Sequence, residues 1–229
     1  MSLLDSSLER RLVEVQRRIA SRVVLEDRFS GEAVAGVDQA FLGDLVISGA
    51  VLLGPDGDVR SRASHTMKAT VPYVPGFLSF REGPTAIKAV RTLDRRPTLL
   101  FVDGCGINHP RMAGLATYIG VILDMPTIGV SKSVLCGSFD LPEKVGEAKP
   151  LIYRGEVVGY LLKSKKGCRP IVVAPGNKIS VDSALEMTRR CLKGHKLPEP
   201  CRLAHEHANW VKDRGSNEVI KKKPINNSN

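Results

Sequence analysis

The sequence contains no apolar run that reaches the roughly 18 residues needed to cross a bilayer. The longest run, Ala116 to Leu123, is followed by Asp124 and Pro126. The N-terminal stretch lacks the apolar centre of a signal peptide, because acidic and basic side chains lie close together there. These absences predict a cytoplasmic protein with no membrane partner, and a monomer is the default expectation.

Cysteine pairs of the usual structural kinds are also missing. The five cysteines are an odd number, and no two have Cys-x-x-Cys spacing, so reduced thiols are expected rather than a disulfide framework. A zinc site near the C-terminus is an alternative, but its spacing follows no common pattern and Pro198 and Pro200 interrupt it. Its candidate ligands are Cys191, His195, Cys201, His205 and His207. No G-x-x-x-x-G-K phosphate loop is present, which disfavours an ATPase.

Basic residues are in clear excess. The chain of 229 residues has 34 Lys and Arg against 24 Asp and Glu, a net charge of +10. A positive field of this kind attracts polyanions and speeds their encounter with the protein. The run Lys221 to Lys223 contributes to the count, but an excess remains without it. Charge therefore favours nucleic acid as the partner over a basic surface that binds nothing.

Hydrophobic patterning predicts an α/β protein. An amphipathic helix is expected over 6–28, followed by three strands whose short links indicate an antiparallel meander. These strands are expected at about 33–41, 44–53 and 58–68. Further strands are expected at 98–102, 127–130, 157–162 and 171–173, and helices at 79–93, 111–123 and 182–192.

This order of elements predicts a mixed β-sheet with helices on its faces. The first three strands are expected to be antiparallel and the later ones parallel. No linker divides the chain, so we expect one domain over residues 1–214. Residues 215–229 are expected to form a disordered basic tail.

Three acidic residues stand in apolar or glycine-rich surroundings. Asp38 lies within an apolar strand, where an uncompensated carboxylate is costly. Asp103 ends another apolar strand, and ligand sites gather beyond the carboxyl ends of parallel strands. Glu82 lies near the start of a helix, where it also complements the helix dipole. Each acid alone has a structural explanation, but together they predict a site for Mg²⁺, which prefers carboxylate oxygens.

Six stretches around these acids form long motifs. They are Val34–Asp38, Tyr73–Glu82, Val102–Gly114, Pro126–Lys132, Val181–Leu185 and Leu197–His205. Together they resemble the endonuclease V family of deoxyinosine-specific endonucleases over about residues 8–210. The resemblance implies a ribonuclease H-like fold, which agrees with the order of elements above.

The resemblance also implies a reaction. It is the Mg²⁺-dependent hydrolysis, with Mn²⁺ as a substitute, of the second phosphodiester bond on the 3′ side of a deaminated base. The cut leaves 3′-hydroxyl and 5′-phosphate ends, and damaged DNA that contains deoxyinosine is the implied partner in DNA repair. The implied metal ligands are Asp38, Asp103, Glu82 and His205. Lys132 and His109 are implied near the scissile phosphate, as a neutralising charge and a proton or hydrogen-bond donor.

Lesion recognition is implied at other positions. A base must leave the stack to be read in a pocket, and Tyr73 is implied to fill the gap that it leaves. Arg81 is a candidate phosphate contact. The implied pocket for hypoxanthine consists of Gly76, Leu78, Gly104, Gly106, Leu115 and Leu135.

Two alternatives stay open. An inosine-specific ribonuclease of the same fold would differ in a contact to the 2′-hydroxyl, and no residue of the sequence identifies that contact. A non-catalytic nucleic-acid-binding domain would share the charge and Tyr73. Such a domain would not need three converging acids, which repel phosphate when no cation is bound.

Overall fold

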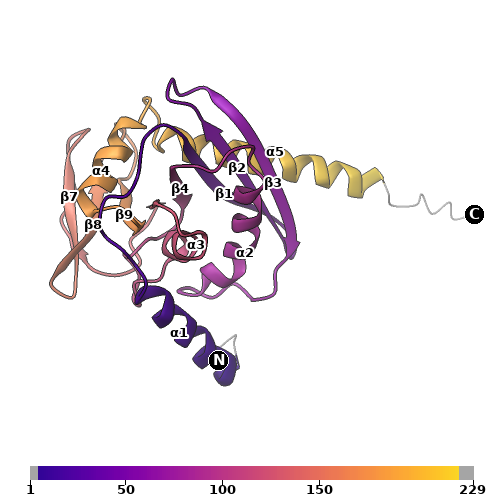
Figure 1. Cartoon of the computed structure of the whole chain (residues 1–229), viewed down its shortest axis with the longest axis horizontal. Helices are drawn as coiled ribbons and strands as arrows, with labels where there is room; N and C mark the ends of the chain where they lie inside the picture. The colour runs from indigo at the N-terminus through magenta and orange to yellow at the C-terminus, as the bar shows by residue number, and fades with distance from the viewer. Residues whose placement is uncertain (1–4, 222–229) are drawn as a thin grey trace, which may run out of the picture.

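A nine-stranded sheet runs through the computed structural model, which describes residues 5–221. Its strand order is β3-β2-β1-β4-β5-β9-β8-β7-β6, and helices cover both faces (Figure 1). The strands are β1 (Val34–Leu42), β2 (Leu45–Leu53), β3 (Val59–Lys68), β4 (Leu99–Asp103), β5 (Thr127–Ser131), β6 (Ser138–Phe139), β7 (Ala148–Tyr153), β8 (Glu156–Leu162) and β9 (Ile171–Asn177). The helices are α1 (Ser6–Ala20), α2 (Leu78–Arg91), α3 (Leu115–Leu123), α4 (Val181–Arg190) and α5 (Glu199–Lys221).

The pairing of the strands confirms the predicted mixed α/β fold. β1, β2 and β3 form the expected antiparallel meander, and β4 and β5 continue the sheet in parallel with β1. The parallel pairing expected of the later strands ends there, because β9, β8, β7 and β6 all pair antiparallel. The three central parallel strands therefore end at one edge, where Asp103 lies.

Two apolar layers hold the helices on the sheet. On one face α2 and α3 pack over a core that includes Val37, Leu100 and Val102. On the other face α4 and α5 pack over a core that includes Phe101 and Ile128. Because side chains alternate along a strand, Asp38 and Asp103 both belong to the α5 side of the sheet.

Several elements differ from the prediction. α1 ends at Ala20 rather than near residue 28, because the backbone of Val24 instead bonds to the Asn177 side chain. α3 begins only at Leu115, since the preceding loop contains Met112 with a positive φ of 52°. Sequence patterning did not predict β6, β7 or α5. α5 extends to Lys221, so 215–221 are helical where disorder was expected, and 222–229 lie outside the described residues.

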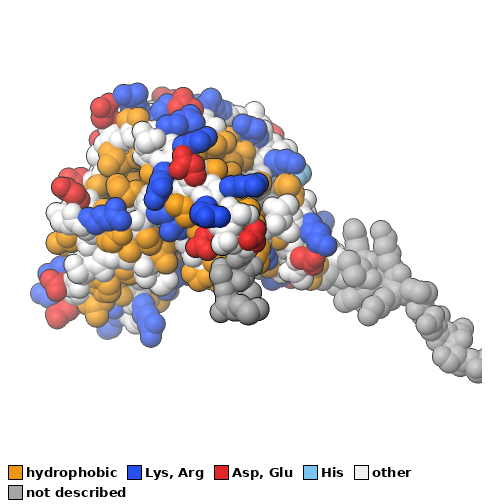
Figure 2. All heavy atoms as spheres, turned by 90° about the horizontal axis from the view of Figure 1, so that it is seen from below, with side chains coloured by type: hydrophobic (Ala, Val, Ile, Leu, Met, Phe, Trp, Pro, Cys, Tyr) orange, Lys and Arg blue, Asp and Glu red, His pale blue; other side chains and the backbone are white. Residues whose placement is uncertain are grey.

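Surface and core features complete the fold. Within residues 5–221 no helix is both long and apolar enough to span a membrane. All five cysteines are free, and the two zinc candidates Cys191 and Cys201 pack in or against an apolar core cluster. Lys and Arg side chains spread across the face in Figure 2, between patches of apolar surface. This face therefore presents positive charge beside apolar side chains.

Candidate active site

The two aspartates lie side by side at the centre of the sheet. β1 and β4 are parallel neighbours with Val37 opposite Val102, so the next residues, Asp38 and Asp103, are adjacent. Both line one pocket, and the negative charge of Asp103 acts on Asp38. Burial, and then that charge, raise the pKa of Asp38 to about 6. The expected convergence of these two carboxylates is therefore present in the structure.

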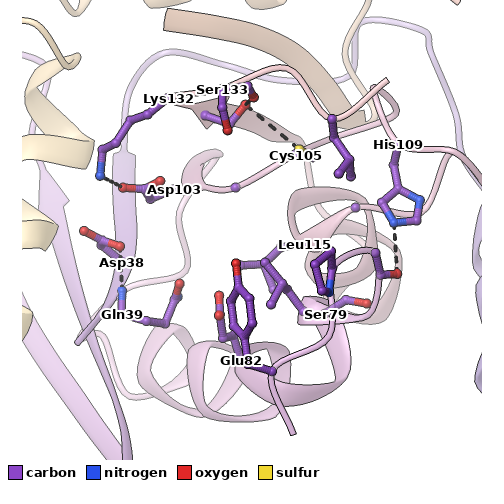
Figure 3. A pocket seen from close by; sticks show the side chains of 18 of the residues that line it. Asp38, Gln39, Ser79, Glu82, Asp103, Cys105, His109, Leu115, Lys132 and Ser133 are labelled. Atoms are coloured by element: carbon purple, nitrogen blue, oxygen red, sulfur yellow. Dashed lines mark hydrogen bonds and ion pairs between the residues drawn. The ribbon is translucent and has the colours of Figure 1, made fainter. Parts of the chain in front are cut away.

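Glu82 completes the acidic group from the opposite layer. It lies on the second turn of α2, is only 8% exposed, and lines the same pocket. Burial raises its pKa to about 7, and the charges of Asp103 and Asp38 add to the effect. Figure 3 shows Glu82 below the two aspartates, across a hollow from Asp103. The charge of Asp103 thus destabilises the ionised forms of Asp38 and Glu82, which is the condition that a bound cation relieves.

Helix α5 supports Asp38 from behind. The ring of His205 lies on this helix, and its Nδ1–H donates to Asp38 Oδ2 at 2.6 Å. The other oxygen of Asp38 accepts the backbone N–H of Gln39 at 2.7 Å. His205 therefore orients the carboxylate.

A lysine neutralises the second aspartate. Lys132 directly follows β5, and its Nζ lies 2.7 Å from Asp103 Oδ2. Burial alone would lower the pKa of Lys132, but the charges of Asp103 and Asp38 outweigh it, so the pKa is raised and the ammonium is charged. A fixed positive charge therefore lies at the wall of the pocket.

The pocket itself has a volume of about 370 Å³. Besides Asp38, Glu82 and Asp103 its wall includes eight further residues that the sequence had singled out. They are Tyr73, Gly76, Leu78, Gly104, His109, Leu115, Lys132 and Leu135. Tyr73 is 60% exposed and stands at the rim, whereas His109 is buried.

Three expected residues do not line the pocket. Arg81 donates to the Val71 carbonyl oxygen at 2.9 Å and lies over the Phe41 ring. The N–H of Gly106 bonds to Asn108 Oδ1 at 2.8 Å, and a Cβ at Gly106 would collide with the backbone carbonyl of Pro175. His205 reaches the site only through Asp38.

His109 is held by backbone groups on both sides of its ring. Nε2–H donates to the Gly76 carbonyl oxygen at 3.1 Å, and Nδ1 accepts the N–H of Arg111 at 3.1 Å. Burial lowers the pKa of His109 to about 4, so the ring is neutral near pH 7. The expected contact of His109 with a phosphate stays a prediction, since both nitrogens are engaged in the structure.

Sequence reasoning missed several pocket residues. Gln39 and Ser79 line the wall, and Gln39 Nε2 and Ser79 Oγ are buried without a hydrogen-bond partner among the described residues. Figure 3 places Gln39 between Asp38 and Glu82. The signal that could have found Gln39 is its place directly after Asp38 in an otherwise apolar strand.

The donor set fits a hard divalent cation. Three carboxylates from β1, β4 and α2 face one pocket, and oxygen ligands of this kind suit Mg²⁺ or Mn²⁺. Within residues 5–221 no three His, Cys, Asp or Glu side chains already have the close spacing of a metal cluster. The Lys132 ammonium and the His205 ring lie against the aspartates instead. A cation would therefore compete with Lys132 for Asp103.

Comparison with known proteins identifies the family. The family model described as Endonuclease V matches residues 17–206. The chain belongs to the endonuclease V family. The protein named Endonuclease V from Archaeoglobus fulgidus is 46% identical over 214 residues, which are 92% of this chain and 96% of that protein.

Solved structures agree with this assignment. The endonuclease V of Streptomyces avermitilis superposes with a TM-score of 0.85 at 33% identity, covering 91% of this chain and 94% of that chain. The endonuclease V of Ciona intestinalis, solved with a DNA that contains an inosine followed by a ribo-adenosine, has a TM-score of 0.78. At 20% identity, over 92% of this chain and 99% of that chain, the Ciona protein shows the shared fold alone. The chain is thus a member of a nuclease family with the fold of endonuclease V.

Proposed function

We propose that this protein is a divalent-cation-dependent endonuclease that cuts a nucleic acid strand close to a deaminated base. The observation that carries the proposal is the meeting of Asp38, Glu82 and Asp103 at the wall of one pocket. Three buried or half-buried acids at one point are unfavourable in a protein that only binds phosphates. They are useful in one that holds a cation against a phosphate.

Each residue near the acids has a role in this proposal. Asp38, Glu82 and Asp103 would hold Mg²⁺ or Mn²⁺, which supplies a Lewis acid for the phosphate and lowers the pKa of bound water. Lys132 offers its ammonium to the negative charge that develops on the phosphate. His205 keeps Asp38 in one orientation.

The remainder of the pocket suits a base rather than a phosphate. The whole pocket, with a volume of about 370 Å³, lies in the range of small-molecule sites, and Leu78, Leu115 and Leu135 give this part apolar sides. We propose that hypoxanthine enters it from deoxyinosine in damaged DNA, and that Tyr73 fills the gap left in the stack. The cut is then at the second phosphodiester bond on the 3′ side, leaving 3′-hydroxyl and 5′-phosphate ends, as a step in DNA repair.

The test uses matched oligonucleotides that carry a single inosine in DNA or in RNA. We expect cleavage with Mg²⁺ and none with EDTA, and faster cleavage of the DNA. Mapping of the product ends checks the position of the cut. Faster cleavage of the RNA would identify an inosine ribonuclease instead, and binding without cleavage under any cation would leave only a nucleic-acid-binding domain.

Asp103→Asn tests the acidic site directly. We expect turnover to fall by roughly three orders of magnitude, on the scale of losing a principal electrostatic group. Binding of the inosine DNA in Ca²⁺ should survive. Asp58→Asn, on the exposed turn before β3, is the matched control and should cleave like the unchanged protein. Normal turnover by Asp103→Asn would remove Asp103 from the site.

A further inference from the structure

One backbone oxygen beside the pocket accepts three hydrogen bonds. The carbonyl oxygen of Gly76 accepts from Gln16 Nε2 at 2.8 Å, from Arg111 Nη2 at 3.0 Å and from His109 Nε2 at 3.1 Å. Gly76 has a positive φ of 82° and belongs to the loop of residues 71–77, here named the Tyr73 loop. The three donors come from two other parts of the chain, α1 and the loop between β4 and α3.

The donors also bond to one another. Arg111 Nε donates to Gln16 Oε1, so the side-chain amide of Gln16 is used on both its oxygen and its nitrogen. The guanidinium of Arg111 also lies 4.7 Å from the centroid of the ring of Phe77, the residue that follows Gly76. Gln16, Arg111 and Gly76 therefore form a closed ring of hydrogen bonds, which we name the Gln16 latch.

Gln16 occupies a position where an apolar residue would be expected. It is 1% exposed, and the other buried residues of α1 are Leu12 and Ile19. Leu12 packs with Phe77 in one cluster, so α1 already lies against the Tyr73 loop through apolar contacts. A buried amide is tolerated only when its hydrogen bonds are made, and a fully satisfied network fixes the geometry of its members.

The latch joins two segments that both line the pocket. Tyr73, Pro75 and Gly76 line it from the Tyr73 loop, and Gly104 and His109 line it from the segment between β4 and α3. Because the Gly76 oxygen ties these two segments together, the spacing between them depends on Gln16 and Arg111. Neither of these two residues lines the pocket.

We propose that Gln16 and Arg111 are positioning residues that set the width of the base pocket, so that lesion selectivity depends on α1. The proposal rests on the proposed function, since it takes the pocket to be the place of the extruded base. It assigns to α1 a role in recognition without contact to the nucleic acid. Tyr73, which is 60% exposed, lies in the same loop as the held Gly76.

The main variant is Gln16→Leu, which has a similar volume and removes both hydrogen bonds. We expect hydrogen exchange of the amides in 73–78 to become about tenfold faster in the protein without metal or nucleic acid, because a local constraint is lost. We expect KM for inosine DNA to rise about tenfold, the scale of one or two net hydrogen bonds, while kcat stays within about twofold. Preference for inosine DNA over undamaged DNA should fall with it.

Two further variants separate the latch from general damage. Arg111→Lys keeps the charge and one donor, and we expect it to retain more selectivity than Arg111→Met. Glu14→Leu changes an exposed residue of the same helix and should leave exchange and selectivity unchanged. Thermal unfolding of each variant checks that the fold is kept.

Failure of the latch and failure of the proposed function give different experimental results. Unchanged exchange in 73–78 together with unchanged selectivity in Gln16→Leu would overturn the latch. Equal loss of selectivity in Glu14→Leu would also overturn it. Failure of the unchanged protein to cleave any inosine substrate would refute the proposed function and the selectivity role, whereas hydrogen exchange still decides whether Gln16 holds the loop.

Discussion

At the scale of single residues, the site brings three acidic side chains together with one lysine. Asp38 and Glu82 are buried and repelled by Asp103, while Lys132 offsets part of that charge and His205 donates a hydrogen bond to Asp38. The cost falls on the ionised forms, so protonation and cation binding relieve the same strain. The free energy of unfolding of the metal-free protein should therefore depend on pH.

The pH dependence of stability has a definite sign. The folded-state pKa of Glu82, about 7, exceeds its unfolded value of 4.5, so the folded state binds more protons between these values. The contribution of Glu82 to the free energy of unfolding therefore falls as pH rises through this window. In EDTA we expect Glu82→Gln to remove about 2 kcal/mol of the stability change between about pH 5 and pH 8.

Denaturant unfolding at the two pH values measures this difference. Glu32→Gln, at an exposed position before β1, serves as the control and should keep the slope of the unchanged protein. Identical pH profiles for Glu82→Gln and the unchanged protein would show that Glu82 does not carry the shift.

The sequence could predict some of these residues for a physical reason. Asp38 and Asp103 interrupt apolar strands, and the alternation of a strand fixes the face on which each lies. Gln16 and Arg111 could not be found in this way. A single Gln in an amphipathic helix and an Arg in a loop are common. Their role here comes from contacts between distant segments: Gln16 and Gly76 are 60 residues apart, and Gln16 and Arg111 are 95 residues apart.

At the scale of elements, two glycines in the sheet allow α5 to pack closely against it. A Cβ at Gly36 would collide with the backbone of Pro200, and one at Gly49 would lie 2.6 Å from the backbone nitrogen of Ala208. Both glycines share the face of Asp38, so α5 rests almost directly on β1 and β2. This close approach is what brings His205 within 2.6 Å of Asp38.

Gly36→Ala should therefore loosen α5 and the site together. We expect a loss of about 3 kcal/mol in the free energy of unfolding, since the clash is with backbone and cannot be relieved by a rotamer change. Urea denaturation measures it. Gly31→Ala is the control, because its Cβ would make only an ordinary contact at 3.8 Å. Equal stability of the two variants would contradict the close packing of α5.

The same packing explains why α5 escaped prediction. Its buried positions include Ala204 and Ala208, small residues that give little apolar signal in the sequence. The strands β1 and β2 were predictable because they are rich in apolar strand-forming residues, and the Gly54–Gly57 turn marks the start of β3, in which buried and exposed residues alternate. β6, with two residues, is too short for any pattern to indicate.

At the scale of the whole molecule, positive charge extends well beyond the pocket. The net charge is +10, and basic side chains spread over the face in Figure 2. Such a surface binds the phosphate backbone without regard to sequence and releases counterions as it does so. The protein is thus expected to sample undamaged nucleic acid before a lesion enters the pocket.

The dependence of DNA binding on salt concentration tests this expectation. We expect the Kd for undamaged duplex DNA to rise by about 10³-fold between roughly 50 and 200 mM salt. The cleavage rate at saturating inosine DNA should change far less over the same range. Fluorescence anisotropy gives the Kd values, and a Kd that does not respond to salt would contradict a binding mode based on backbone charge.

The two outermost strands of the sheet limit association between copies of the protein that are crowded together. β3 carries exposed Arg60, Arg62 and Lys68 along its length, and β6 at the opposite end has only two residues. Neither border offers a long, flat, uncharged row of free amides, which is what strand-to-strand stacking between copies requires. Many copies bound along one duplex should therefore not associate through their sheet edges, and each copy should dissociate from the duplex independently of its neighbours.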